Sequence, residues 1–188
     1  MEIPSIAEAI GPFHAAAGAA FNTFTTKKDI SPSPLPVIPG GKLRAGSKIA
    51  MRAWGEYSTT GTPTLRLGFW LGARGTGASG TGVITIDVAV TALVATPSAA
   101  AAWPWWMEWE GLVTLAGTAG SIVGQGQSQR GLTVATFESE APIPITAALR
   151  TVAIDTTIER AIGVSGEWGT SSASNGVTVN GLRVMVWN

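Results

Sequence analysis

Apolar and polar residues alternate along most of the chain after residue 42, which is the period-two pattern of half-buried β-strands. The clearest run spans residues 105–115. Its odd positions hold Trp, Met, Trp, Gly, Val and Leu, and its even positions include Glu108 and Glu110. One face of this run is therefore predicted to pack into a core and the other to face outward, as in a central strand of a β-sandwich.

The same pattern recurs at even spacing and predicts about eight strands, separated by clusters of Gly, Thr, Ser and Pro that are typical of turns. A change of parity at Asn180–Gly181 predicts a bulge or tight turn in the last strand. The predicted strands lie at residues 48–59, 64–71, 83–94, 105–115, 121–137, 143–154, 158–168 and 177–187. Without a long amphipathic helix in residues 42–188, the chain is predicted to be all-β. The fold class is a jelly-roll-like antiparallel β-sandwich with an extended N-terminal arm.

Residues 1–41 differ in composition and are predicted to form that arm, with residues 42–188 as the sandwich domain. The prolines between residues 32 and 39 favour extended polyproline geometry and cannot pair as a central strand. A disordered tail is the alternative, but the segment is more apolar than a solvated tail normally is. The residues predicted to contact a partner molecule are Ile6, Ile10, Phe13, Phe21 and Phe24.

Four of the eight tryptophans lie within residues 103–109. A tryptophan buries a large apolar surface, and its indole N–H needs a hydrogen-bond partner. The structural interpretation is that these residues build the core. The functional alternative is an aromatic platform for a sugar or a partner chain, with Trp103 and Trp106 as its candidate residues.

Composition narrows the classes of function. The chain of 188 residues has 12 basic and 12 acidic side chains, and this zero net charge disfavours nucleic-acid binding. Its apolar runs are shorter than the ~18 residues of a membrane helix, so no membrane partner is expected. Cysteine is absent, which excludes disulfides and thiolate metal sites. The low charge also predicts a closed homo-oligomer that buries apolar surface.

Reactive groups do not converge anywhere in the sequence. The only histidine, His14, lies in the arm, so a histidine-dependent triad or a multi-histidine metal site in the sandwich is excluded. Residues 75–80 match GxGxxG, but a β-branched strand follows where a dinucleotide site needs a helix, so they are interpreted as a hairpin loop. Glu108 and Glu110 could serve acid–base chemistry or simply face solvent or a neighbouring subunit's arginine. We expect no enzyme, no cofactor and no metal.

Three stretches resemble a group of small virion structural proteins of tailed bacteriophages. They are ISPSPLPVIPGGKLRAGSKIAMRAWGEYSTTGTPTLRLGFWLG, WPWWMEWEGLVTLAGTAGSIVGQGQ and RTVAIDTTIERAIGVSGEWGTSSASNGVTV. The resemblance covers most of residues 31–179 and lies in short motifs such as STTGTPTL, TVAIDTT and WGTSSASNGVTV. It implies a β-sandwich exposed on, or built into, the virion, and it carries no catalytic residues.

Two functions follow from this resemblance as expectations. The first is a capsid decoration protein that binds the outside of the head and reinforces the shell through its arm and its oligomeric β-domain. Its partners would be other copies of itself, as a homotrimer, and the major capsid protein or another virion protein. The alternative is a tail-tip or fibre domain that binds host-surface carbohydrate. A polysaccharide hydrolase is disfavoured by the residue inventory.

Overall fold

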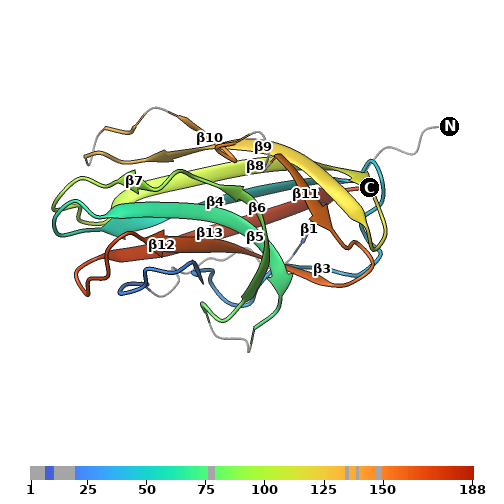
Figure 1. Ribbon diagram of the computed structural model, residues 1–188, viewed down its shortest axis with the longest axis horizontal. Coiled ribbons are helices and arrows are strands. Elements are labelled where there is room, and N and C mark those ends of the chain that lie inside the picture. The colour runs from blue at the N-terminus through green and yellow to red at the C-terminus, as the bar shows by residue number, and fades with distance from the viewer. Residues whose placement is uncertain (1–6, 11–19, 76–78, 134–135, 139, 147–149) are drawn as a thin grey trace.

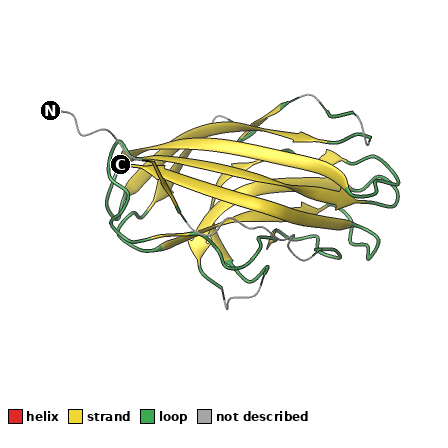
Figure 2. Cartoon of the chain, turned by 180° about the vertical axis from the view of Figure 1, so that it is seen from behind, coloured by secondary structure: helices red, strands yellow, loops and turns green. Residues whose placement is uncertain are grey.

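Two antiparallel β-sheets pack face to face, and their long strands run along the long axis of the molecule (Figure 1). The computed structural model describes residues 7–10, 20–75, 79–133, 136–138, 140–146 and 150–188. Within these residues the strands are joined by loops and turns without an α-helix (Figure 2). The described residues also contain no helix that is long and apolar enough to cross a membrane. The structure confirms the predicted all-β antiparallel sandwich.

The first sheet, sheet A, carries the tryptophan-rich strand near its centre. Its strands are β1 (Ala7–Ala9), β4 (Lys48–Ser58), β8 (Trp103–Leu115), β9 (Gly120–Arg130), β10 (Ala141–Ile143), β11 (Thr151–Ile154) and β13 (Gly176–Trp187). They are ordered β1–β13–β4–β8–β9–β10, and β11 also pairs with β9. The two strands beside the tryptophan-rich strand β8 are therefore β4 and β9.

The second sheet, sheet B, faces sheet A across the core. Its strands are β2 (Lys28–Asp29), β3 (Val37–Ile38), β5 (Thr64–Ala73), β6 (Val83–Val90), β7 (Val94–Ala95) and β12 (Arg160–Trp168). They are ordered β2–β12–β5–β6, with β3 also on β12 and β7 also on β5. The pairing of β4 with β13 encloses the pairing of β5 with β12 in sequence. The first long strands, β4 and β5, therefore pair with the last two, β13 and β12. This nested pairing is a feature of the predicted jelly-roll-like arrangement.

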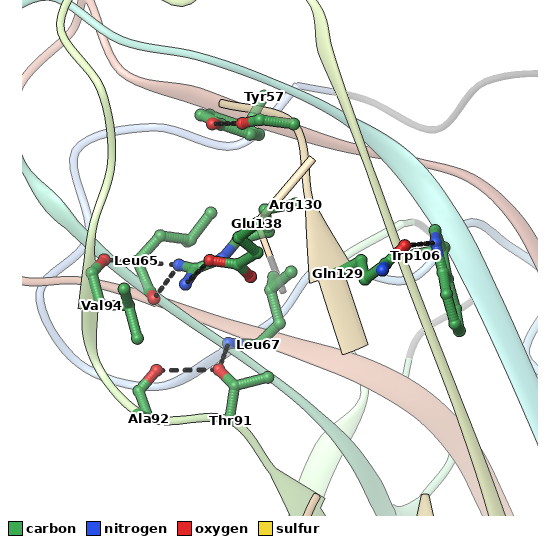
Figure 3. Close-up of polar contacts among 11 residues, drawn as sticks. Tyr57, Leu65, Leu67, Thr91, Ala92, Val94, Trp106, Gln129, Arg130 and Glu138 are labelled. Atoms are coloured by element: carbon green, nitrogen blue, oxygen red, sulfur yellow. Dashed lines mark hydrogen bonds and ion pairs between the residues drawn. The ribbon is translucent and has the colours of Figure 1, made fainter. Parts of the chain in front are cut away.

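Most predicted runs coincide with the long strands, but β9 ends at Arg130, before the end of the run predicted at residues 121–137. Strand pairing of residues 83–94 is interrupted at Thr91, whose hydroxyl accepts the Leu67 N–H at 3.0 Å in place of a backbone carbonyl (Figure 3). The run predicted at residues 143–154 begins at the last residue of β10, and the separate strand β11 follows only after Pro144, which has no N–H to donate. The predicted irregularity in the last strand is confirmed, because the register of β13 against β4 shifts between Val179 and Gly181.

Inward-facing tryptophans pack against glycines on neighbouring strands. Trp105 and Trp109 are each 1% exposed. A Cβ atom added to Gly124 would lie 2.1 Å from Trp109 Cζ2, and one added to Gly55 would lie 2.8 Å from Trp105 Cζ2. These glycines therefore leave the space that the indoles fill, and the odd positions from Trp105 to Val113 face the core as predicted. Leu115, which has the same parity, was predicted to face the core as well, but it is 53% exposed because the register of β8 against β9 shifts between Val113 and Leu115.

The described part of the predicted arm belongs to the sandwich, which differs from the expectation of an arm that lies on another molecule. Residues 28–38 run antiparallel to β12 and form one edge of sheet B. The Ile30 N–H donates to the Val164 carbonyl at 2.8 Å, and Ile30 and Ile38 are 0% and 1% exposed. The prolines of residues 32–36 are tolerated there because the strand is at an edge. The apolar side chains of this segment are buried against its own core.

Three of the five side chains predicted to contact a partner are described, and all three pack within the chain. Ile10 is 7% exposed and its N–H donates to a β13 carbonyl. Phe21 is 9% exposed and forms a bridge with the same strand, while Phe24 packs partly buried against the core. Ile6 and Phe13 lie outside the described residues. The described phenylalanines and Ile10 thus pack within this chain, and a role for them as partner contacts stays a prediction.

A buried polar cluster joins the two sheets where β9 ends (Figure 3). The Arg130 side chain, 7% exposed, donates through Nε and Nη2 to the Glu138 carboxylate, at 2.9 Å in each case. Its Nη1 donates to the Leu65 carbonyl of sheet B at 3.1 Å. Nearby, the Tyr57 hydroxyl donates to the Gly131 carbonyl. One guanidinium therefore links sheet A, sheet B and the segment after β9.

The buried Tyr57 hydroxyl predicts a loss of stability at alkaline pH. Burial raises the pKa of Tyr57 to about 12, while the Arg130 charge lowers it and the Glu138 charge raises it. An unfolded tyrosine titrates near pH 10, so between about pH 10 and 12 the unfolded chain loses this proton while the folded chain keeps it. The free energy of unfolding should fall as pH rises through this window. Urea unfolding should show a smaller fall for Tyr57→Phe, and equal falls in both proteins would contradict this assignment.

Candidate ligand-binding groove

The outer face of sheet A carries an open groove of about 570 Å³ that crosses its central strands. The polar side chains that line it are Arg52, Glu108, Glu110, Gln125, Gln127, Arg150 and Arg183. A neighbouring hollow of about 670 Å³ shares Glu110, Gln125 and Arg150 with it and continues over Lys48 and Leu112. Because the two share lining residues, they form one continuous surface, which we call the outer groove.

Strand register arranges the first set of these side chains in a row across the sheet. Arg183 on β13 lies opposite Arg52 on β4, and Arg52 lies opposite Glu108 on β8. Glu108 in turn lies opposite Gln127 on β9, whose Nε2 donates to the Glu108 carboxylate at 2.9 Å. Directly opposed residues on one face have Cβ atoms about 5 Å apart. The row is therefore a continuous band of hydrogen-bonding groups with a fixed order.

The next row forms the floor of the outer groove. Met185, Ala50, Glu110 and Gln125 lie opposite one another in that order on β13, β4, β8 and β9. Ala50 has the smallest side chain of this row. Its small size leaves open space between Met185 on one side and Glu110 on the other. Glu110 and Gln125 are both exposed. A carboxylate acceptor and an amide that both donates and accepts are thus presented side by side.

Tryptophans lie at both ends of this face. Trp54 and Trp106 are opposite each other, and Trp106 Nε1 donates to Gln129 Oε1 at 3.1 Å (Figure 3). Trp54 is 42% exposed and lies over Gly181, where an added Cβ would be 2.1 Å from Trp54 Cζ2. At the other end, Trp187 is half-buried and lines both hollows. Along the strand direction, the two polar rows therefore lie between Trp54 and Trp106 at one end and Trp187 at the other.

Several charged groups of the outer groove are not engaged in ion pairs. The ion pairs among the described residues are Lys27–Asp87, Lys42–Glu8, Arg66–Glu167 and Arg130–Glu138. None of them includes Arg52, Glu110 or Arg150. These side chains are therefore available to a ligand without first breaking an internal salt bridge.

The structure separates the two tryptophans that were predicted to form one platform. Trp103 packs partly buried against the core, with its ring edge-on to Tyr57 at a centroid distance of 6.4 Å. Trp106 lies on the outer face of the same strand. Trp103 and Trp106 therefore cannot present one surface, and the aromatic neighbour of Trp106 is Trp54 from β4.

Sequence reasoning missed Trp54, Arg52 and Trp187 as parts of the site. Trp54 and Arg52 have the outward parity of β4, which is a signal that they face away from the core. The sequence contains no signal that places them beside Trp106 and Glu108, because strand register is set by the three-dimensional pairing. Parity identified the outward residues, and only the sheet order brought them together.

The other sequence motifs have structural placements. Gly75, Ser79 and Gly80, the described residues of the GxGxxG match, lie between β5 and β6, where Ala73 pairs with Val83, which agrees with the loop interpretation. Residues 76–78 of that motif, and His14, lie outside the described residues. Glu108 and Glu110 both face outward from β8, which agrees with the predicted parity.

No protein-family model and no curated protein matches this chain. Among solved structures, it is similar to the CBM2 module of the evolved Dit of Lactobacillus casei BL23 phage J-1. The TM-score is 0.36 at 9% sequence identity, over 94% of this chain and 79% of that chain. It is also similar to a legume lectin-like domain from Entamoeba histolytica, with a TM-score of 0.33 at 9% identity, over 95% of this chain and 88% of that chain. At these values the comparisons assign neither a family nor a ligand to this chain.

Proposed function

We propose that this protein is a carbohydrate-binding component of a bacteriophage virion and that the carbohydrate binds in the outer groove of sheet A. The observation that carries the proposal is the polar rows on one solvent-facing sheet surface, bounded by tryptophans at both ends. Sugar hydroxyls pair with carboxylates, amides and guanidinium groups, and the apolar faces of sugar rings stack on indoles. The virion location is supported by the sequence resemblance described above.

The outer groove is well suited to hold a sugar because its side chains stand on rigid strands. Gln127 is already oriented by its hydrogen bond to Glu108, so its position requires little further ordering on binding. Glu110 and Gln125 together supply acceptors and donors for neighbouring hydroxyls of one ring. Trp106 and Trp187 offer stacking surfaces for rings farther along the chain.

The proposed activity is binding without turnover. Glu108 and Glu110 lie in adjacent rows of the outer groove, since both project from one face of β8. The two carboxylates of a glycosidase flank the scissile bond. Glu108 accepts the Gln127 amide and Glu110 lies opposite Gln125, so we assign both carboxylates to the recognition of sugar hydroxyls.

Binding to an array of bacterial surface polysaccharides tests the proposal. We expect the purified protein to bind a subset of the array, and Glu110→Ala or Gln125→Ala to weaken that binding at least about tenfold. A hydrogen bond with a charged group contributes roughly 1.5–3 kcal/mol, and each 1.4 kcal/mol is about a factor of ten. Glu159→Ala, at an exposed glutamate outside the outer groove, is the matched control. Unchanged binding in the groove variants would contradict the assigned site.

A second candidate function, attachment to other virion proteins, is favoured by an apolar patch on sheet A. Leu112, Leu115 and Val123 are 38%, 53% and 37% exposed, and Leu112 lies opposite Val123. Exposed apolar clusters of this kind mark protein contacts. In this candidate, the protein forms a homotrimer that decorates the outside of the head and binds the major capsid protein through the β-domain.

Light scattering tests the assembly candidate. We expect the mass of a trimer for the wild-type protein and a shift toward the monomer for Leu115→Glu, because a charge cannot be buried in an apolar interface without a partner. Leu115 does not line the outer groove, so carbohydrate binding by each copy should persist in this variant. A monodisperse wild-type monomer at high concentration would contradict the assembly candidate and leave the carbohydrate proposal standing.

A further inference from the structure

The outer groove changes in chemical character along the strands of sheet A. One of its two hollows includes the polar row with Glu108 and Gln127. The other hollow is lined by the apolar side chains of Leu112 and Val123. The two hollows meet at Glu110, which lines both of them. A polar half and an apolar half therefore lie next to each other on one continuous surface.

The apolar half is open to solvent. Leu112 and Val123 lie directly opposite each other on β8 and β9, and they are 38% and 37% exposed. Exposed apolar surface gains free energy when an apolar group covers it. Glu110 lies two residues away from Leu112 on β8, which is only about 7 Å along the strand. The group that fits over Leu112 and Val123 is therefore a small apolar one, attached to a polar molecule.

The side chains that line this hollow match the three parts of an acetamido group. Leu112 and Val123 provide apolar contacts for its methyl group. The Glu110 carboxylate can accept a hydrogen bond from its amide N–H, and the Lys48 ammonium can donate one to its carbonyl. Glu110 belongs to none of the ion pairs among the described residues. A sugar hydroxyl in the same place would satisfy Glu110 but would leave Leu112 and Val123 uncovered.

We propose that the carbohydrate bound in the outer groove contains an N-acetylated sugar, whose acetamido group lies over Leu112 and Val123. This inference rests on the proposed function, because it names the chemical class of the carbohydrate that the same groove binds. The next sugar unit lies over the polar row of Glu108 and Gln127, which continues the groove in the direction of Trp106. The ligand is therefore a chain of sugars rather than a free monosaccharide.

Chemical editing of one polysaccharide tests the inference by titration calorimetry. The probe is the tightest-binding polysaccharide of the array, used intact, after de-N-acetylation, and after re-N-acetylation of the freed amines. We expect de-N-acetylation to weaken binding at least about tenfold and re-N-acetylation to restore it. N-formylation of the same amines restores the amide without its methyl group, and binding should then stay about three- to fivefold weaker than for the intact probe. A tight-binding polysaccharide without any N-acetylated sugar would overturn the inference.

Variants of the apolar half show whether the acetamido group lies there. Leu112→Ser should reduce the preference for the intact probe over the de-N-acetylated one to less than about threefold. Leu93→Ser is the matched control, because Leu93 is 39% exposed and does not line the groove, and its preference should be unchanged. Val123→Thr is a second, nearly isosteric change in the same hollow and should also lower the preference. Thermal unfolding verifies that each variant folds.

The possible results separate the inference from the proposed function. Equal affinity for the intact and de-N-acetylated probes would overturn the inference and leave the proposed carbohydrate function intact. That result would also be expected if another copy of the chain covered Leu112 and Val123, as in the assembly candidate, and light scattering would then detect the oligomer. Absence of binding to every polysaccharide of the array would instead overturn the proposed function itself.

Discussion

Replacing Trp109 by alanine is expected to lower the free energy of unfolding by about 3–5 kcal/mol, the range for deletion of a large buried aromatic side chain. Trp109 is 1% exposed, and its indole lies against Gly111 and Gly124. Removing it leaves a cavity that these glycines have no side chains to fill. Urea unfolding followed by circular dichroism measures the change.

Trp106→Ala is the matched control, because Trp106 is on the same strand but on the outer face. Its expected cost is smaller, since its side chain is only half-buried and its indole N–H loses one hydrogen bond to Gln129. Equal losses for the two variants would mean that both faces of β8 are covered equally. That result would contradict the solvent-facing groove.

Replacing Arg130 by alanine is expected to cost a similar amount, about 3–5 kcal/mol, for a different physical reason. The substitution leaves the Glu138 carboxylate without its cation in a site where that side chain is 17% exposed. It also removes the donor to the Leu65 carbonyl, which lies in the opposite sheet. Chemical unfolding measures this cost, and a loss below about 1 kcal/mol would mean that the cluster is not a link between the sheets.

A double variant separates two contributions to the free energy of unfolding: the cost of leaving Glu138 without its cation, and the stabilisation by the Arg130–Glu138 ion pair itself. Arg130→Met combined with Glu138→Leu replaces both charged groups by apolar side chains of similar size. Because a buried ion pair and a well-packed apolar pair are often nearly equal in stability, we expect the double variant to recover most of the loss. Failure to recover would indicate that the carbonyl contacts, rather than the ion pair, dominate.

The alternation of residues was sufficient to predict the architecture. In residues 105–113 the parity alone separated the core-facing tryptophans from the outward glutamates, and the structure confirms that separation. The parity shift near Gly181 likewise predicted the bulge that the strand register contains. Both predictions succeeded because successive side chains of a strand point to opposite faces of the sheet. The order of apolar and polar residues therefore shows which positions face inward.

The arm and the binding site depend on contacts that are distant in sequence. Proline density predicted that residues 32–36 would not form a central strand, but it did not reveal that Ile30 and Ile38 would close the edge of the chain's own sandwich. In the same way, Trp54 becomes the neighbour of Trp106 only through the pairing of β4 with β8. The composition of a segment shows how much apolar surface it can bury. Which surface it packs against depends on the three-dimensional fold.

A crystal structure of the protein with an oligosaccharide selected from the polysaccharide array tests the central claim most directly. We expect sugar hydroxyls within about 3 Å of the Glu110 carboxylate and the Gln125 amide, with a ring stacked on Trp106 or Trp187. A sugar held by the loops at an end of the sandwich, with the outer groove of sheet A unoccupied, would contradict it.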